Sequence, residues 1–352
     1  MRFLLLGANG QLGRSFIKDG GLAARGDLVV ASRDGTSAES FGGPARHSSE
    51  SWNPAPSLVD GLKALDPGLR RDDEPETAAS RPPIVAVDLA TPESLPALLD
   101  RVRPDVIINA AAYTAVDRAE QEEALATRVN GEAVGVLGRW AAMHGAMVIH
   151  YSTDYVFDGR QSQPYAIDAP ANPLGAYGRS KLAGEQALRE SGAAHFLFRT
   201  AWVYAAHGHN FLRTMLRLGA ERDEVRVVAD QHGAPTDTDL IVDGTLAALD
   251  RWLSSDHAQR KALVGTYHLV ASGATTWHGF ASTIFEQASA LGLLPRQPRV
   301  TSITSAEFPT PAVRPKYSLL DNGDFQQHFR FTLPDWRLGL QDVMRRLAAS
   351  GH

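Results

Sequence analysis

The feature that most constrains the fold lies at the start of the chain, where a short apolar run is followed by closely spaced glycines. Residues 3–6 (FLLL) are continuously apolar, which is typical of a strand buried on both faces of a parallel sheet. Gly7, Gly10 and Gly13 follow, directly before the helical apolar spacing of 12–17. Such glycines let a pyrophosphate approach the N–H groups of a helix N-terminus. The pattern predicts a dinucleotide-binding strand–turn–helix unit, although a tight structural turn would need the same glycines.

Short apolar strands and amphipathic helices then alternate along the chain. The expected strands are 27–31, 84–87, 105–109, 146–151 and 196–200, and the expected helices are 92–101 and 119–144. This alternation is typical of a parallel sheet covered by helices on both faces. The predicted fold class is therefore α/β: a Rossmann-type doubly wound parallel sheet with a smaller C-terminal α/β substrate-binding domain.

Composition divides the chain further. Residues 35–83 are rich in Ser, Pro, Gly, Arg and Asp, which predicts an inserted, largely irregular segment. After residue 203 the alternation of strands and helices ends, although a helix over 239–253 is expected to pack back on the first domain. The expected domains are a dinucleotide-binding domain of 1–203 plus about 237–262, and a sugar-nucleotide-binding domain of about 204–236 plus 263–352.

Charge and residue usage exclude several classes of protein. The 352 residues carry a formal net charge of −5, which argues against nucleic acid or an anionic membrane as partner. The chain has no cysteine, so disulfides, thiolate zinc sites and cysteine nucleophiles are excluded. The apolar stretch at the N-terminus is too short for a signal peptide, and no later stretch would span a membrane. We expect a cytoplasmic protein.

The ends of the second and third expected strands predict the cofactor. Ser32-Arg33 stands where an acidic residue would bind a ribose 2′-hydroxyl, and Arg33 instead suits a 2′-phosphate. This favours NADPH as the cofactor, with NADH as the alternative. If Arg33 has no role in binding, it is a solvated arginine in a loop. Asp88 is placed to accept from an adenine amino group or to cap the next helix. The small residues after Asn109 leave room for a ribose and nicotinamide.

Tyr177 and Lys181 are the candidate catalytic pair. They lie one helical turn apart on one face, and a nearby ammonium stabilises a phenolate and lowers the pKa of the phenol. Thr153 ends the preceding strand, at the sheet edge where open α/β proteins bind ligands. We interpret His150 as a packing residue at the end of a strand. His207 and His209 lie in a glycine-bearing loop without metal-ligand spacing.

Several segments together are specific for one family. They are GANGQLG at 7–13, NAAAYTAVDRAE at 109–120, STDYVFDG at 152–159, NPLGAYGRSK at 172–181, RTAWVY at 199–204, VVADQHGAPT at 227–236 and RPKYSLLD at 314–321. With them the chain resembles the dTDP-4-dehydrorhamnose reductase family of extended short-chain dehydrogenases/reductases. The resemblance implies NADPH-dependent reduction of the C4 ketone of a dTDP-sugar, in the synthesis of dTDP-L-rhamnose for bacterial surface polysaccharide.

The resemblance also implies roles for single residues. Tyr177 matches the proton donor, Lys181 its pKa-lowering partner and ribose ligand, and Thr153 the hydroxyl that orients the substrate oxygen. The positions that match cofactor contacts are Gly7, Gly10, Gln11, Leu12, Gly13, Arg33, Asp88, Leu89, Ala110, Ala111, Ala112 and Tyr113, and those that match sugar contacts are Asp154 and Trp202. Some members bind Mg²⁺ at a dimer interface through a glutamate whose counterpart is Ser15. We therefore doubt a metal, and a homodimer is a possible assembly.

Two alternatives stay open. The same framework serves nucleotide-sugar epimerases and dehydratases, although Asp154 is followed by Tyr155 and not by the glutamate typical of dehydration. A non-catalytic regulatory subunit of methionine adenosyltransferase also has this fold. The intact set of Thr153, Tyr177 and Lys181 favours an enzyme over such a subunit. Arg314 is a further candidate, for pairing with a nucleotide phosphate.

Overall fold

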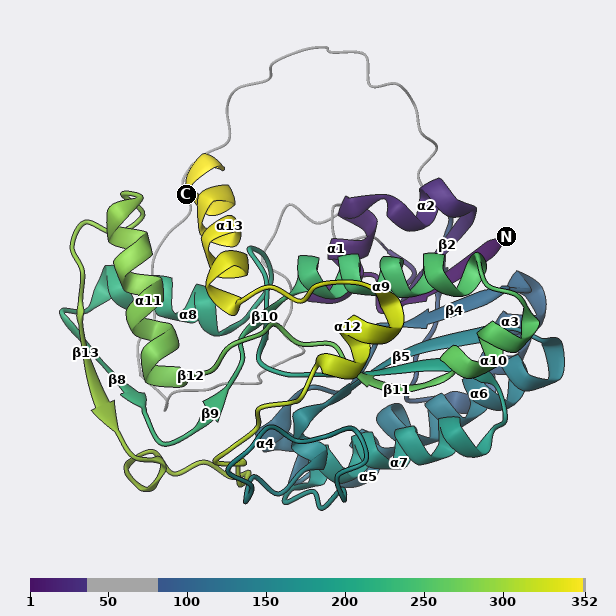
Figure 1. Ribbon diagram of the computed structural model, residues 1–352, viewed down its shortest axis with the longest axis horizontal. Coiled ribbons are helices and arrows are strands. Elements are labelled where there is room, and N and C mark those ends of the chain that lie inside the picture. The colour runs from purple at the N-terminus through teal and green to yellow at the C-terminus, as the bar shows by residue number, and fades with distance from the viewer. Residues whose placement is uncertain (37–81, 351–352) are drawn as a thin grey trace, which may run out of the picture.

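A computed structural model describes residues 1–36 and 82–350 of the chain (Figure 1). Seven strands form one parallel sheet, in the order β11-β6-β5-β4-β1-β2-β3. Along the chain these strands are β1 (Arg2–Leu6), β2 (Asp27–Ser32), β3 (Ile84–Ala86), β4 (Val106–Asn109), β5 (Met147–Thr153), β6 (Ala194–Thr200) and β11 (Gly265–His268). The predicted α/β class with a doubly wound sheet is confirmed. The expected insertion at 35–83 falls almost entirely on residues outside the described part.

The sheet is buried on both faces because its strands are apolar throughout. In β1, Phe3 and Leu5 belong to the core on one face, while Leu4 and Leu6 belong to the core on the other. Helices cover both faces (Figure 1). The helices along this part of the chain are α1 (Gln11–Asp19), α2 (Gly21–Arg25), α3 (Leu95–Val102), α6 (Ala133–His144), α7 (Ala176–Glu190), α9 (Thr238–Leu253) and α10 (His257–Leu263).

The helix expected over 119–144 is interrupted. It consists of α4 (Val116–Ala119), α5 (Glu123–Thr127), a π-helical segment (Arg128–Glu132) and α6. Glycine at 131, within the π segment, is a weak helix former, and π segments are frequent at functional sites. The periodic apolar pattern therefore predicted the helix from residue 123 onward, but neither the turn at 120–122 nor the π-helical segment.

A smaller group of elements lies at the left of Figure 1, beyond the carboxyl ends of the large-sheet strands. It contains a two-stranded parallel sheet of β8 (Glu224–Val228) and β13 (Arg299–Ile303). The other elements of this group and its connections are β7 (Val203–Tyr204), α8 (Phe211–Glu221), β9 (His232–Gly233), β10 (Thr236–Asp237), β12 (Thr275–Thr276), α11 (Trp277–Ala290) and α13 (Trp336–Ala349). The helix α12 (Gly323–Phe329) lies in the middle of Figure 1, against α9 and β11. Its core runs without a break into the core beneath α1 and α9.

The division into two domains stays a prediction, and the topology bears on one part of it. The strand β11 pairs with β6 in the large sheet, although the expected division gave 263–352 to the smaller domain. An ion pair between Arg25 and Asp250 at 2.5 Å joins α9 to α2, near the N-terminus.

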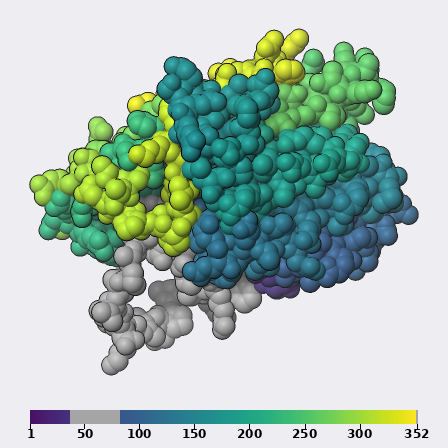
Figure 2. Space-filling view, turned by 90° about the horizontal axis from the view of Figure 1, so that it is seen from below, coloured from purple at the N-terminus to yellow at the C-terminus, as the bar shows by residue number. Residues whose placement is uncertain are grey.

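Figure 2 shows a second place where distant segments meet, because the teal residues near 160 lie against the yellow-green residues near 320. Here Tyr165 N donates to Leu319 O at 2.8 Å, and Asp321 N donates to Tyr165 O at 2.9 Å. Within the described residues, no helix is both long and apolar enough to cross a membrane.

Candidate active site

The glycine-rich loop connects β1 to α1 by a close backbone approach. Gly7 has a φ of 83°, and a Cβ there would lie 2.7 Å from the backbone nitrogen of Ala111. A Cβ on Gly13 would overlap the carbonyl oxygen of Gly7. Gly10 is exposed and caps α1 without a side-chain hydrogen bond to the helix. In the described part of the chain no side chain caps the N–H groups at the start of α1, as a pyrophosphate site requires.

The side chain of Gln11 is occupied by protein contacts. Its Nε2 donates to His209 O at 3.2 Å, and its Oε1 accepts from Asn210 Nδ2 at 2.8 Å. The ring of His207 lies 3.1 Å from Gln11 O. The two loop histidines, which showed no ligand spacing in the sequence, therefore lie on the glycine-rich loop. Gln11 is left with its backbone N–H for a cofactor.

Arg33 and Asp88 follow the adjacent strands β2 and β3. The Arg33 side chain is 71% exposed, and its Nε lies 3.8 Å from Asp88 Oδ1. The same Asp88 oxygen accepts from Ala90 N at 2.9 Å. Asp34 is turned toward Thr36, whose hydrogen bonds lower the pKa of the Asp34 carboxyl. Among the described residues Asp34 therefore does not compete for the guanidinium, whose ion-pair partner there is Asp88.

Leu12 and Leu89 lie in the same region, and both pack into the hydrophobic cores. They can reach a cofactor chiefly through their backbone atoms.

The segment after β4 crosses the loop between β1 and α1 and is held by Asn130. Asn130 is fully buried in the π-helical segment; its Oδ1 accepts from Tyr113 N at 2.8 Å, and its Nδ2 donates to Tyr113 O at 3.0 Å. The same Nδ2 donates to Ser180 Oγ at 2.9 Å. Asn130 therefore joins the alanines before Tyr113 to the helix that carries Tyr177. Sequence reasoning missed this residue, and its only signal was an asparagine at a buried helical position.

Helix α7 brings Tyr177 to the carboxyl end of β5. The helix begins after Gly175, where Glu120 Oε1 accepts from Ala176 N at 2.8 Å. A Cβ on Gly178 would overlap the carbonyl oxygen of Tyr155, so glycine lets the helix approach that loop. The ring of Tyr155 meets the ring of Tyr177 edge to face at 5.6 Å.

Thr153, Asp154 and Tyr177 form one hydrogen-bonded group. The hydroxyl of Thr153 donates to Asp154 Oδ1 at 3.0 Å, and the phenol of Tyr177 is hydrogen bonded to Thr153. This contact with Thr153 lowers the pKa of the Tyr177 phenol, but other effects outweigh it. Burial raises the pKa of Tyr177 above its ordinary value, and the negative charge of Asp154 adds to this effect.

Asp154 is a buried carboxylate. Burial raises its pKa to about 6. Contacts with Ser318 and Thr153 oppose this rise of the pKa. The Ser318 hydroxyl donates to His232 O at 3.2 Å, and Oδ2 of Asp154 has no hydrogen bond of good geometry among the described residues. An unpaired buried oxygen of this kind is costly for stability and typical of functional sites.

Lys181 is oriented differently from the expectation. Its Nζ donates to Tyr151 O at 2.6 Å and lies 3.3 Å from His150 Nε2. Burial lowers the pKa of Lys181 to about 8. The lowering of the Tyr177 pKa by this lysine stays a prediction: burial is the main cause of the raised pKa of Tyr177, and the amine is directed to Tyr151 and His150. His150 is likewise part of a buried polar contact and does not merely pack.

Trp202 has a φ of 49°, in the left-handed region that costs a non-glycine residue energy. Its indole stacks on Trp277 at 3.6 Å, with an interplanar angle of 8°. Trp277 in turn lines a small cavity of about 20 Å³ with Gln231 and Arg314. The two indoles form an aromatic surface beside this cavity.

Arg314 is engaged in a buried ion pair. Its guanidinium donates to both carboxylate oxygens of Asp117, at 3.0 and 2.8 Å. The pair joins the segment before Pro315 to α4. If Arg314 binds a nucleotide phosphate, as the sequence suggested, its guanidinium must contact the phosphate and Asp117 at the same time.

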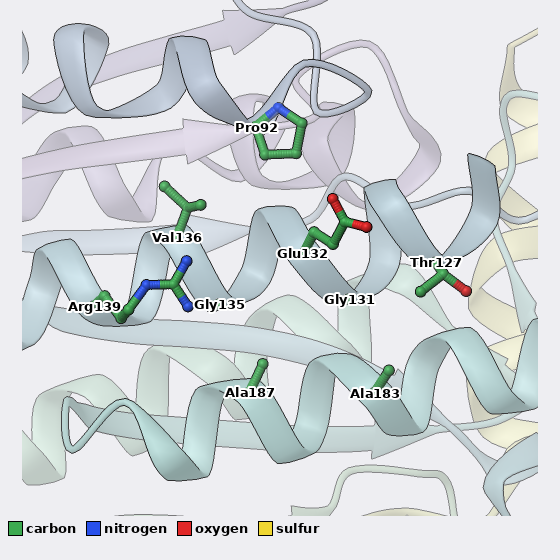
Figure 3. A pocket seen from close by; sticks show the side chains of 9 residues that line it. All are labelled: Pro92, Thr127, Gly131, Glu132, Gly135, Val136, Arg139, Ala183 and Ala187. Atoms are coloured by element: carbon green, nitrogen blue, oxygen red, sulfur yellow. The ribbon is translucent and has the colours of Figure 1, made fainter. Parts of the chain in front are cut away.

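The larger hollow, of about 390 Å³, lies away from these groups, between α6 and α7 (Figure 3). Glycines and alanines line much of it, including Gly131, Gly135, Ala183 and Ala187. Thr153, Asp154 and Tyr177 do not line this hollow, so the chemistry belongs to the Thr153–Tyr177 group and not to the hollow.

No group of three or more metal-ligating side chains occurs within the described residues. Ser15, the counterpart of the family's magnesium-binding glutamate, is buried and donates to Thr238 Oγ1 at 2.8 Å.

Comparison with known proteins agrees with this geometry. The family model for the RmlD substrate binding domain matches residues 1–349. A dTDP-4-dehydrorhamnose reductase of Burkholderia thailandensis is 47% identical over 262 residues, which cover 74% of this chain and 88% of the relative. The chain belongs to the dTDP-4-dehydrorhamnose reductase family. The family inferred from the motifs is thus confirmed.

Other members of the family support the same assignment. The reductase of Shigella flexneri is 44% identical over 260 residues, covering 74% of this chain and 85% of that one. Among solved structures, the dTDP-4-dehydrorhamnose reductase of Bacillus anthracis in complex with NADP has a TM-score of 0.75 at 28% identity. That match covers 98% of this chain and 99% of the other.

Proposed function

We propose that this protein reduces the C4 ketone of dTDP-4-dehydro-β-L-rhamnose to dTDP-β-L-rhamnose, a precursor of surface polysaccharide, with NADPH as reductant and NADH as the alternative. The observation that carries the proposal is the position of the Thr153–Asp154–Tyr177 group. It lies at the carboxyl end of β5, in the same sheet as the open glycine-rich loop at the end of β1. Open α/β sheets bind their ligands at this edge.

The residues around the loop fit the proposed cofactor. Gly7, Gly10 and Gly13 leave the N-terminus of α1 accessible to a pyrophosphate. The exposed Arg33 suits a 2′-phosphate, and the bound dinucleotide would supply the hydride for C4. Asp88 and the backbone of Leu89 would contact the adenine. Ala110, Ala111, Ala112 and Tyr113 would lie along the ribose and nicotinamide.

Tyr177 is the proposed proton donor. Its raised pKa keeps the phenol protonated at neutral pH, which is the form that a reduction requires. The phenol can exchange its hydrogen bond with Thr153 for one to the O4 atom of the substrate. Thr153 then orients the same oxygen, and Asp154 holds a sugar hydroxyl through its unpaired oxygen. Trp202 covers a face of the sugar, and Lys181 binds the cofactor ribose.

One assay tests the reaction. Purified protein is mixed with the 4-keto sugar nucleotide and NADPH, and the loss of the nicotinamide absorbance is compared with the amount of product. We expect one NADPH consumed for each product molecule. An epimerase would form product without net consumption of NADPH, and a regulatory subunit would show no turnover.

Assembly and location are proposed separately. The protein acts on a dTDP-sugar, and we expect neither nucleic acid nor membrane as partner. The small residues along α6 and α7 would let helices of a second copy approach closely (Figure 3), which supports a homodimer. Light scattering during gel filtration measures its mass, and cell fractionation tests the expected cytoplasmic location.

A further inference from the structure

His150 is a fully buried imidazole that the proposed reaction does not use. It lies in β5, next to Tyr151, whose carbonyl oxygen accepts from Lys181. Its Nε2 lies 3.3 Å from Lys181 Nζ, and its Nδ1 lies 3.1 Å from Asn109 Nδ2. The sheet register places Asn109 directly beside it on β4. The ring thus connects the end of β4 to the lysine of α7.

The charged groups around this connection are few. Burial lowers the pKa of His150, and the positive charge of Lys181 and the neighbouring His195 of β6 add to this effect, so the imidazole is neutral. On α7, Glu185 is the nearest acid to Lys181, but it is held by Arg199 at 2.8 Å and by Ser152 at 2.6 Å. His150 is therefore the one titratable side chain in hydrogen-bond contact with Lys181 among the described residues.

A neutral imidazole has one donor and one acceptor, so its two contacts are linked. An ammonium only donates, and a charged Lys181 requires Nε2 of His150 to accept. The ring hydrogen is then on Nδ1 and must meet the oxygen of Asn109. In the orientation of the structure, Asn109 instead presents Nδ2 to the ring, which matches the uncharged amine.

The orientation of Asn109 is in turn linked to the cofactor side of the site. Its Oδ1 accepts from Ala111 N at 3.3 Å, and Ala111 lies in the segment that passes Gly7. In the other orientation Nδ2 would face Ala111 N, and because both groups are donors this hydrogen bond would be lost.

We propose that His150 is a positioning residue that fixes Lys181 and transmits to it the orientation of the Asn109 amide. The inference rests on the proposed function only in that Lys181 binds the cofactor ribose. Lys181 then has two fixed partners, Tyr151 O and His150 Nε2, and its remaining N–H is directed to the ribose. The protonation of Lys181 is coupled to Asn109 through the ring.

Three substitutions of His150 separate its two nitrogens. In His150→Gln, the side-chain amide reaches the place of Nε2; in His150→Asn, it reaches only the place of Nδ1; His150→Leu removes both. The measurement is the Kd of NADPH from its fluorescence, with the thermal melting temperature as a check of folding. We expect about tenfold weaker binding for the Asn and Leu variants and binding within about threefold of wild type for Gln. Equal binding by all three, or equal loss by all three, would overturn the proposal.

A pH series tests the coupling. Asn109→Asp places an acceptor and a negative charge beside Nδ1, which favours the ammonium form of Lys181. Because a charged ammonium donates stronger hydrogen bonds to the ribose than an uncharged amine does, binding should weaken above about pH 8 in the wild type. In the variant, the pH at which NADPH binding weakens should be higher by about one unit. When His150→Leu is also present, Asn109→Asp should shift this pH by less than half as much, because no imidazole then connects residue 109 to Lys181.

An equal shift in both backgrounds would show that the effect of Asn109→Asp does not pass through His150. Should Asn109→Asp fail to fold, the three His150 variants still decide whether the ring positions Lys181. Cofactor binding is measured without sugar substrate, so a protein that binds NADPH but does not turn over the keto sugar would fail the proposed function alone.

Discussion

The hydroxyl of Thr153 donates its hydrogen to Oδ1 of Asp154 across 3.0 Å, at the end of β5. That hydrogen is the one with which Thr153 would polarise the substrate oxygen. The Asp154 carboxylate therefore competes with the substrate for the hydroxyl hydrogen of Thr153. The protonation state of Asp154 thus influences how strongly Thr153 can polarise the ketone oxygen.

Asp154→Asn is expected to stabilise the protein. The pKa of Asp154 is raised to about 6 from the ordinary 3.8, so the charged form is disfavoured in the folded state. The resulting destabilisation is complete above about pH 6 and disappears as the pH falls toward 3.8. Removing the charge should add up to about 3 kcal/mol to the unfolding free energy at pH 8.

Urea unfolding of wild type and Asp154→Asn at pH 8 and pH 4 measures this effect, and Asp158→Asn, at a more exposed aspartate, is the control. A gain of the same size at both pH values would show that the burial of a charge is not its cause.

Tyr177→Phe keeps the ring and removes the proton donor. The kcat should fall on the order of 10²–10⁴-fold, the range for the loss of a general acid. The Kd of NADPH should change little, because Lys181 and the glycine-rich loop are untouched. Single-turnover kinetics is the measurement, so that product release does not hide the chemical step. A variant that keeps more than a tenth of the rate would exclude Tyr177 as the donor.

Arg33→Ala should reduce the preference for NADPH. A charge-assisted contact to a phosphate contributes roughly 1.5–3 kcal/mol, so the KM for NADPH should rise about 10- to 100-fold. The KM for NADH should stay nearly constant. Arg103→Ala, on the surface after α3, serves as the matched control. If both KM values rise together, Arg33 does not recognise the 2′-phosphate.

Asn130→Ala should weaken the binding of cofactor and lower stability. It leaves the N–H and C=O of Tyr113 without their side-chain partner, and each unpaired buried group costs roughly 1–3 kcal/mol. Asn130→Asp keeps the acceptor for Tyr113 N and should lose less. Melting temperature and the Kd of NADPH are the two measurements. An alanine variant with both values unchanged would contradict the role given to Asn130.

The sequence predicted those parts of the site that depend on local pattern. The glycine-rich loop could be found because an apolar run and three glycines specify strand, turn and helix within a few residues. Thr153 and Tyr177 could be paired because a strand end and the first turn of the following helix meet at one sheet edge.

Contacts between distant segments could not be found in the same way. Asn130 acts on Tyr113 and Ser180, and nothing in an asparagine at that position indicates those partners. His150 has the apolar neighbours of a packing residue, and its contacts with Asn109 and Lys181 follow from the register of β4 and β5. The direction of the Lys181 amine depends on the carbonyl of Tyr151, which a helical spacing of four residues does not reveal.

The place of β11 has a consequence for how the protein is made. The strand at residues 265–268 closes one edge of the large sheet beside β6, and much of the smaller group of elements comes between them in the chain. On the ribosome, the first two hundred or so residues emerge before that edge strand exists. During synthesis β6 presents unpaired backbone N–H and C=O groups, a template for wrong pairing with another chain. The nascent protein is therefore exposed to wrong pairing at β6 in the interval between the emergence of β6 and that of β11.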